Sequence, residues 1–154
     1  MPILPKEFSD MVIALVDDDP DDRFIIRRSL NYIPQRISIV EYEDGRECLD
    51  AFLNSAAQNE HPAEMIVLDL NMPRMNGQEF LKAFRADRRF ANVPIVVLTT
   101  ADDAETLQSV LDLGANASMS KSGDWNTRGA LSQFISDCWM DGPFDFDEPL
   151  LVKA

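Results

Sequence analysis

The sequence predicts an α/β fold in which one parallel sheet of five strands is covered by helices on both faces. Short apolar runs alternate along the chain with amphipathic stretches of helical period. The apolar runs are rich in Val and Ile and largely continuous, which is typical of strands that are buried on both sides. The 154 residues have the length of one domain with a sizeable core.

Each predicted strand is followed by a predicted helix, so that the strand–helix unit occurs five times, as (βα)5. We expect the strands at Val12–Val16, Ile37–Glu41, Met65–Leu68, Pro94–Leu98 and Ala117–Ser120. Short connections with right-handed crossovers favour an open doubly wound sheet of the flavodoxin-like type, with strand order 2-1-3-4-5. Ligands of such sheets bind outside the carboxyl ends of the strands where the order reverses, which is between the first and third strands.

Caps and apolar residues at helical spacing indicate the helices. Asp19 and Pro20 are typical of a helix start, and the first helix is expected to run to about Leu30 with Phe24 on its buried face. The next three helices are expected at Gly45–Leu53, Gly77–Ala86 and Ala104–Leu113. The fifth is expected to bury an apolar stripe consisting of Leu131, Phe134, Ile135, Cys138 and Trp139.

Composition excludes several classes of function. The formal net charge of −13 argues against nucleic acid as a partner, because such binding depends on Lys and Arg. No apolar run is long enough to span a membrane and the N-terminus lacks a secretory signal, so we expect a cytoplasmic protein without a membrane partner. Cys48 and Cys138 fall on apolar helix faces and are interpreted as buried hydrophobes. His61 precedes Pro62 in a predicted loop and is expected to be solvated, so no triad or histidine metal site is predicted.

Charged and hydroxyl side chains follow four of the predicted strands. Asp17 and Asp18 follow the first strand, Asp69 the third, Thr99 the fourth and Lys121 the fifth. Two neighbouring carboxylates would oppose ionisation of a third and repel an incoming phosphoryl group. A divalent cation resolves this conflict, and Mg²⁺ is the ion that bridges carboxylates and phosphate oxygens. The pattern therefore predicts a Mg²⁺-dependent site that places a phosphoryl group on an aspartate.

These stretches resemble the receiver domain of two-component response regulators over about residues 10 to 140. The matching segments are Leu15-Val16-Asp17-Asp18-Asp19-Pro20, Val67-Leu68-Asp69-Leu70-Asn71-Met72-Pro73, Asn76-Gly77, Val97-Leu98-Thr99-Thr100 and Lys121. The resemblance implies that Asp69 is the phosphoacceptor for the phosphohistidine of a sensor histidine kinase. It also implies that Mg²⁺ or Mn²⁺ is held by Asp17, Asp18, Asp69 and the Asn71 carbonyl, and that Thr99 and Lys121 hold the phosphoryl oxygens.

The sequence departs from the receiver pattern after and before Lys121. Ser122 stands where the family usually has proline, and a trans peptide bond is expected there. Ser118 stands where the family commonly has the aromatic residue of its activation switch. We therefore expect a phosphorylation signal to be transmitted through the loop or helix between Asp102 and Leu113.

The domain boundaries follow from the same comparison. We expect an N-terminal extension over residues 1–10, the receiver domain over 11–141 and an acidic, apolar tail over 142–154. We expect a stand-alone receiver, which acts by docking to a partner or by passing the phosphoryl group to a downstream phosphotransfer protein. A single receiver domain with such extensions resembles the receivers that are paired with bacterial phytochrome kinases. The tail is either a frayed terminus or an arm that lays Phe144, Phe146, Leu150 and Leu151 on a second subunit. The face of the fourth and fifth helices is another possible surface for a homodimer.

Two other functions remain open on the sequence alone. An aspartate-nucleophile phosphatase of the haloacid dehalogenase type uses similar groups, but it needs an acid at the position of Asn71. A pseudo-receiver would bind partners without taking a phosphoryl group. Each site residue also has a purely structural interpretation, with Asp69 as a loop acid, Thr99 as a strand residue and Lys121 as a solvated lysine.

Overall fold

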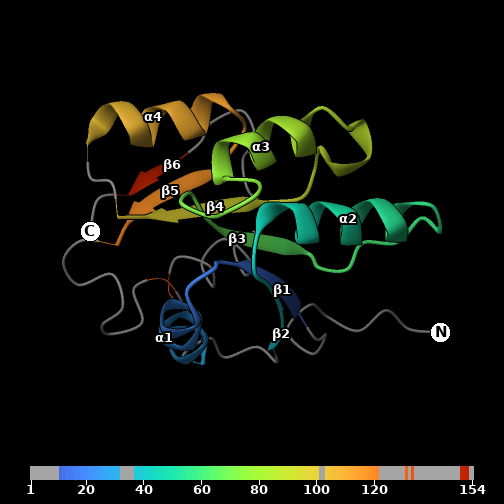
Figure 1. Ribbon diagram of the computed structural model, residues 1–154, viewed down its shortest axis with the longest axis horizontal. Helices are drawn as coiled ribbons and strands as arrows, with labels where there is room; N and C mark the ends of the chain where they lie inside the picture. Colours follow the sequence, from blue (N-terminus) through green and yellow to red (C-terminus); the bar gives the residue numbers. More distant parts are fainter. Residues whose placement is uncertain are drawn as a thin grey trace.

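The computed structural model describes residues 11–31, 37–100, 103–121, 131, 133 and 150–152. Within these ranges, one sheet has the strand order β2-β1-β3-β4-β5-β6, and all of its pairings are parallel (Figure 1). The strands are β1 (Met11–Val16), β2 (Ile37–Tyr42), β3 (Met65–Asp69), β4 (Ile95–Thr99), β5 (Ala117–Ser120) and β6 (Leu150–Val152). The predicted order of the first five strands is confirmed.

The sixth strand was not expected from the sequence. Leu150–Val152 pairs in parallel with β5, in the register Ala117 to Leu150, Ser118 to Leu151 and Met119 to Val152. Leu150 and Leu151 thus belong to the edge of this chain's own sheet, although the sequence predicted a frayed end or an arm on a second subunit. Phe144 and Phe146 of the same tail lie outside the described residues.

The helices lie in two layers. The described helices are α1 (Pro20–Leu30), α2 (Gly45–Ala56), α3 (Gly77–Arg85) and α4 (Ala104–Asp112), with a short 3₁₀ turn at Arg88–Phe90. In Figure 1, α2, α3 and α4 lie on one side of the sheet and α1 lies on the other. No helix in the described part of the chain is long and apolar enough to cross a membrane.

Two apolar cores correspond to these two layers. The core beneath α2, α3 and α4 includes Phe52, Phe80 and Phe84, all fully buried. The second core lies between the sheet and α1 and includes Ile26 and Leu30 of that helix. Because β1, β3, β4 and β5 are buried on both faces, their side chains anchor the centre of the sheet and hold its carboxyl edge in place.

The predicted buried face of α1 is wrong at Phe24. This side chain is 52% exposed, and the buried residues of α1 are Ile26, Ser29 and Leu30. Residues two apart on a helix lie on nearly opposite faces, so burying Ile26 turns Phe24 outward. The guanidinium groups of Arg27 and Arg28 lie 6.0 and 5.9 Å from its ring centroid.

The fifth predicted helix is described only at Leu131 and Gln133, both of which have helical structure. Leu131 is fully buried in the same core as Ile26 and Leu30. The other members of the predicted stripe lie outside the described residues; they are Phe134, Ile135, Cys138 and Trp139. Ser122, where a trans peptide bond was expected, also lies outside them.

Candidate functional site

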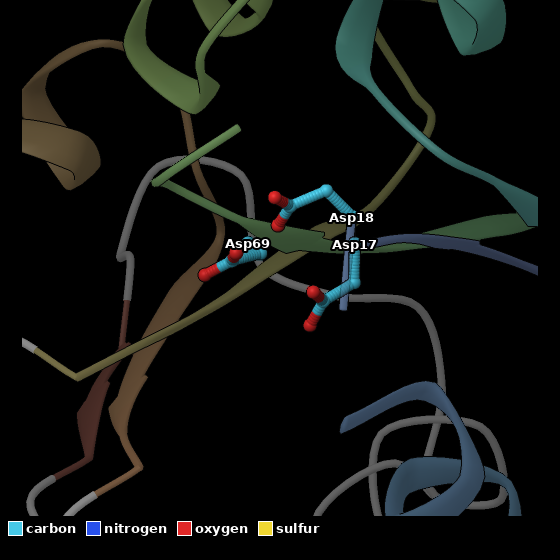
Figure 2. A group of neighbouring side chains, drawn as sticks. All are labelled: Asp17, Asp18 and Asp69. Atoms are coloured by element: carbon cyan, nitrogen blue, oxygen red, sulfur yellow. The ribbon is translucent and has the colours of Figure 1, made fainter. Parts of the chain in front are cut away.

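Three aspartates meet at the carboxyl edge of the sheet. Asp17 and Asp18 directly follow β1, and Asp69 ends the neighbouring strand β3. One carboxylate oxygen from each residue lies within 4.8 Å of the others, and Figure 2 shows the three side chains gathered beside the ends of these strands. Asp17 and Asp69 are buried, whereas Asp18 is exposed. The cluster therefore has two shielded carboxylates and one at an opening to solvent.

Burial makes ionisation of this cluster costly. It raises the pKa of Asp69 to about 6, an effect that the charges of Asp17 and Asp18 increase and that of Lys121 opposes. Burial also raises the pKa of Asp17, although its hydrogen bond from the Asp19 amide and the charge of Lys121 act in the opposite direction. The folded chain thus holds together carboxylates that lack sufficient positive charge, as expected of a site for a cation.

Lys121 brings an ammonium group into this cluster. Its Nζ atom lies 2.9 Å from Oδ2 of Asp17, 2.8 Å from Oδ2 of Asp22 and 3.7 Å from Oδ1 of Asp69, and its side chain is only 4% exposed. Burial alone would lower the pKa of Lys121, but the three carboxylates outweigh that effect and raise it. Lys121 is therefore held as a cation beside Asp69, which excludes its interpretation as a solvated lysine.

Asp22 was not predicted as a site residue. The sequence argument assigned it only to the acidic first turn of α1, where negative charge is favourable. It lies three residues after the N-cap Asp19, so its place at the start of α1 brings it near the carboxyl end of β1, but Asp21 shares that turn and the sequence does not distinguish the two.

Thr99 and Lys121 come from adjacent strands. Thr99 is fully buried at the carboxyl end of β4 and lies in register with Ser120 of β5. The backbone amide of Lys121 donates a hydrogen bond of 2.6 Å to the Thr99 carbonyl oxygen. This bond fixes the chain direction just where the Lys121 side chain leaves β5.

Hydrogen bonds between side chains and the backbone hold the loop after β1 in place. The amide of Asp19 donates to Oδ1 of Asp17 at 2.9 Å, and Nη1 of Arg23 donates to the Asp17 carbonyl oxygen at 2.6 Å. Asp19 also caps α1, as predicted, by accepting a hydrogen bond from the Asp21 amide. Arg23 in turn pairs with Glu41 of β2 at 3.1 Å. These contacts hold the Asp17-Asp18 turn against α1 and β2.

The loop after β3 contains Asn71, which is exposed and lies two residues beyond Asp69. The amide of Gly77 donates to the Leu70 carbonyl at 2.9 Å, and a Cβ atom at Gly77 would lie only 2.8 Å from the Asp69 carbonyl oxygen. Glycine is required here because the start of α3 approaches the backbone of Asp69 so closely.

A buried carboxylate secures the far side of the same loop. Asp44 caps α2 by accepting a hydrogen bond of 3.0 Å from the Glu47 amide. It also forms an ion pair with Arg74, which has a left-handed backbone with φ of 63°. Left-handed backbone is unfavourable for residues other than glycine, so the ion pair helps to hold the loop in this shape.

One departure from the receiver pattern, Ser118, can be located, together with Cys48 and His61, to which the sequence analysis gave no role in the site. Ser118 is fully buried, and its hydroxyl donates to the Leu107 carbonyl of α4 at 3.3 Å, so a side chain at this position links β5 to α4. Cys48 is free and buried, and burial raises the pKa of its thiol, in keeping with its interpretation as a hydrophobe. His61 is exposed and its ring lies near Phe52 and Phe90; it precedes the amino end of β3, whereas Asp69 lies at the carboxyl end of that strand.

The donor atoms of the cluster suit a hard divalent cation. All three clustered side chains offer carboxylate oxygens, and the described residues bring no His or Cys ligand to the group. Mg²⁺ prefers oxygen ligands and retains several waters, which requires an opening such as that beside Asp18. The pKa of Asp69 is raised first by burial and then by the charges of Asp17 and Asp18, and a bound divalent cation would stabilise the ionised carboxylate.

Comparisons with known proteins identify similar chains. Residues 13–127 match the model of the response regulator receiver domain family. The chemotaxis protein CheY1 of Helicobacter pylori is 31% identical over 106 residues, which are 69% of this chain and 81% of CheY1. Response regulator Rcp1 of Synechocystis is 26% identical over 132 residues, covering 84% of this chain and 89% of Rcp1.

Two solved structures have a similar fold. The phosphorylated cyanobacterial phytochrome response regulator RcpA aligns with a TM-score of 0.74 and 25% identity, covering 86% of this chain and 95% of RcpA. The Mn²⁺-bound form of Rcp1 aligns with a TM-score of 0.70 and 26% identity, covering 85% of this chain and 95% of Rcp1. One similar protein is thus described in a phosphorylated form and another with a divalent metal.

Proposed function

This chain belongs to the response regulator receiver domain family, and we propose that it accepts a phosphoryl group on Asp69 from the phosphohistidine of a sensor histidine kinase. One observation carries the proposal. A carboxylate at the end of β3 lies within 4.8 Å of two further carboxylates, with the buried ammonium of Lys121 3.7 Å away. Such a set combines a nucleophile, a place for a cation and a positive charge for phosphoryl oxygens.

The residues of this chain would act mainly by position and charge. An oxygen of Asp69 would attack the phosphorus atom while the bond from phosphorus to the histidine nitrogen breaks. The ammonium of Lys121 and the hydroxyl of Thr99 would hold the phosphoryl oxygens, whose negative charge they stabilise. The Nζ atom of Lys121 lies 3.7 Å from Oδ1 of Asp69, and Thr99 ends the adjacent strand.

Mg²⁺, or Mn²⁺ in its place, would be held by Asp17, Asp18 and Asp69, with the carbonyl of Asn71 as a further ligand. When bound, such a cation neutralises carboxylate charge and attracts phosphoryl oxygens. The chain's own contribution is to keep the Asp17-Asp18 turn in place through Arg23 and the Asn71 loop in place through Gly77. The Mn²⁺-bound form of the similar protein Rcp1 supports this choice of ion.

The partner is proposed to be a kinase of the phytochrome type. The support is the similarity to RcpA, described as a phytochrome response regulator, and to Rcp1. After phosphorylation the domain would act by docking to a partner or by passing the phosphoryl group to a downstream phosphotransfer protein, in the cytoplasm. The net charge of −13 disfavours nucleic acid as that partner.

Acetyl phosphate provides the direct test, since it replaces the kinase as a phosphoryl donor. We expect intact-mass measurement to detect one phosphoryl adduct on the wild-type protein in Mg²⁺, and none when EDTA replaces the cation. Asp69→Asn keeps the side-chain shape but removes the nucleophile, so this variant should form no adduct. An adduct on Asp69→Asn would overturn the assignment, and multiple-turnover hydrolysis of a small phosphomonoester would favour the phosphatase instead.

A further inference from the structure

The ammonium of Lys121 is held closest by two carboxylates that are not the proposed phosphoacceptor. Its Nζ atom lies 2.8 Å from Asp22 and 2.9 Å from Asp17, both within hydrogen-bond distance. The distance to Asp69 is 3.7 Å, which is too long for a hydrogen bond. Asp22 belongs to the first turn of α1, whereas Asp17 and Asp69 follow or end strands of the sheet.

We propose that Asp22 is a positioning residue that holds the Lys121 ammonium away from Asp69 and competes with the phosphoryl group for it. The inference rests on the proposed function, because it concerns the residue that would hold the phosphoryl oxygens. Asp22 is proposed to act through its contact with Lys121 and through its charge, without itself reacting.

Charge supports this role. Asp17, Asp18, Asp22 and Asp69 carry four negative charges, and Lys121 supplies one positive charge. The nearby charges of Arg23 and Glu41 pair with each other at 3.1 Å. A divalent cation would leave the cluster with one excess negative charge, and without Asp22 it would be neutral. Asp22 therefore favours the cation and disfavours the anionic phosphoryl group.

Geometry supports the same conclusion. The Lys121 side chain is 4% exposed, so water cannot readily replace a carboxylate that the ammonium gives up. An ammonium has three donors, and two of them already meet Asp17 and Asp22 at charge-assisted hydrogen-bond distances. A phosphoryl oxygen on Asp69 would compete with these two carboxylates for the ammonium, and Asp22, whose side chain is 30% exposed against 1% for Asp17, is the one that water can more readily solvate if it is released.

The competition predicts effects of opposite sign on two ligands. Asp22→Asn removes the charge while keeping the side-chain shape, so it should weaken Mg²⁺ binding by about threefold, as one charge fewer attracts the ion. At saturating Mg²⁺ the same variant should bind beryllium fluoride, a phosphoryl mimic, about fivefold more tightly, because Lys121 becomes available. A variant that folds poorly would bind both ligands more weakly. Weaker binding of Mg²⁺ together with tighter binding of beryllium fluoride is therefore expected only from a positioning role.

The matched control is Asp21→Asn. Asp21 occupies the same first turn of α1, is exposed and carries the same charge, and the ion pairs described for Lys121 are with Asp17, Asp22 and Asp69 instead. Isothermal titration calorimetry should give nearly wild-type affinities for both ligands in this control. Asp22→Glu keeps the charge and should move both affinities back toward those of the wild type.

The outcomes separate the two proposals. If wild-type protein binds beryllium fluoride and Asp22→Asn binds it no more tightly than Asp21→Asn, the role of Asp22 is wrong while the proposed function stands. If wild-type protein binds no beryllium fluoride at saturating Mg²⁺, both are wrong. Tighter beryllium fluoride binding together with weaker Mg²⁺ binding in Asp22→Asn alone supports the inference.

Discussion

Asp69 is a carboxylate that the fold keeps in an unfavourable environment. It is 8% exposed, and burial together with the charges of Asp17 and Asp18 raises its pKa to about 6 from 3.8. Between these two pH values the folded chain binds a proton that the unfolded chain releases. The contribution of Asp69 to the free energy of unfolding of the metal-free protein therefore falls as the pH rises from about 4 to about 6, and it stays low at higher pH.

Asp69→Asn should thus stabilise the metal-free protein at neutral pH. Each unit of pKa shift corresponds to about 1.4 kcal/mol, so the variant should gain about 2 to 3 kcal/mol over the wild type at pH 7. At pH 4 the difference should be small, because the wild-type carboxyl group is then largely protonated in the folded state. Urea denaturation in EDTA at several pH values measures this difference.

Magnesium is the control for that prediction. At pH 7 the ion should reduce the difference in unfolding free energy between Asp69→Asn and the wild type, since it stabilises the ionised carboxylates of the wild type. A stability difference that stays constant from pH 4 to pH 7 would show that the substitution acts through packing and not through charge.

The main site residues could be predicted because each directly follows or ends a strand. A parallel sheet brings such positions to one edge, whatever the side-chain conformations, so Asp17, Asp18, Asp69 and Lys121 meet as expected. Asp22 could not be assigned in this way because its role depends on where the ammonium of Lys121 points. The pairing of Asp44 with Arg74 was missed for a similar reason, since it depends on the path of a loop.

Among the elements, α1 and β6 differ most from the sequence-based expectation. The rotation of a helix about its own axis decides which of its apolar residues face the sheet. In α1, Ile26 and Leu30 face the sheet, and this rotation turns Phe24 toward solvent. The segment Leu150–Val152 is only three residues long, so it has too few residues to show strand periodicity. Its pairing with β5 is a long-range contact that local pattern cannot predict.

Removing residues 150–154 should leave the outer edge of β5 unpaired. Loss of the strand pairing along Ala117–Met119 should lower the free energy of unfolding by about 1 to 3 kcal/mol and speed hydrogen exchange in β5. An unpaired edge also favours pairing with another chain, so the solution mass should stay the same or rise. Light scattering after size exclusion measures the mass.

The control for the truncation removes only residues 153 and 154, which follow β6. It should behave as the full-length protein does. A fall from dimer to monomer after removing 150–154 would instead support the arm on a second subunit that the apolar tail suggested.

The whole molecule carries 27 acidic and 14 basic residues, so repulsion between like charges within the folded chain lowers its stability. Any salt reduces this general repulsion, since screening at physiological ionic strength acts over about 8 Å. Binding at the acidic cluster is a separate effect that only a suitable cation produces. Mg²⁺ and Na⁺ at equal ionic strength should therefore stabilise the chain to different extents.

We expect Mg²⁺ at 100 times its dissociation constant to add about 2.7 kcal/mol beyond the effect of NaCl at the same ionic strength. Asp18→Asn should lose most of this increment, because Asp18 is a clustered carboxylate at the opening to solvent. Asp21→Asn makes the same change in net charge outside the cluster and should keep it. Thermal and urea denaturation of the three proteins measure the increment. Equal stabilisation of all three by Mg²⁺ would assign the effect to the overall charge, because a cation that only screens cannot distinguish Asp18 from Asp21.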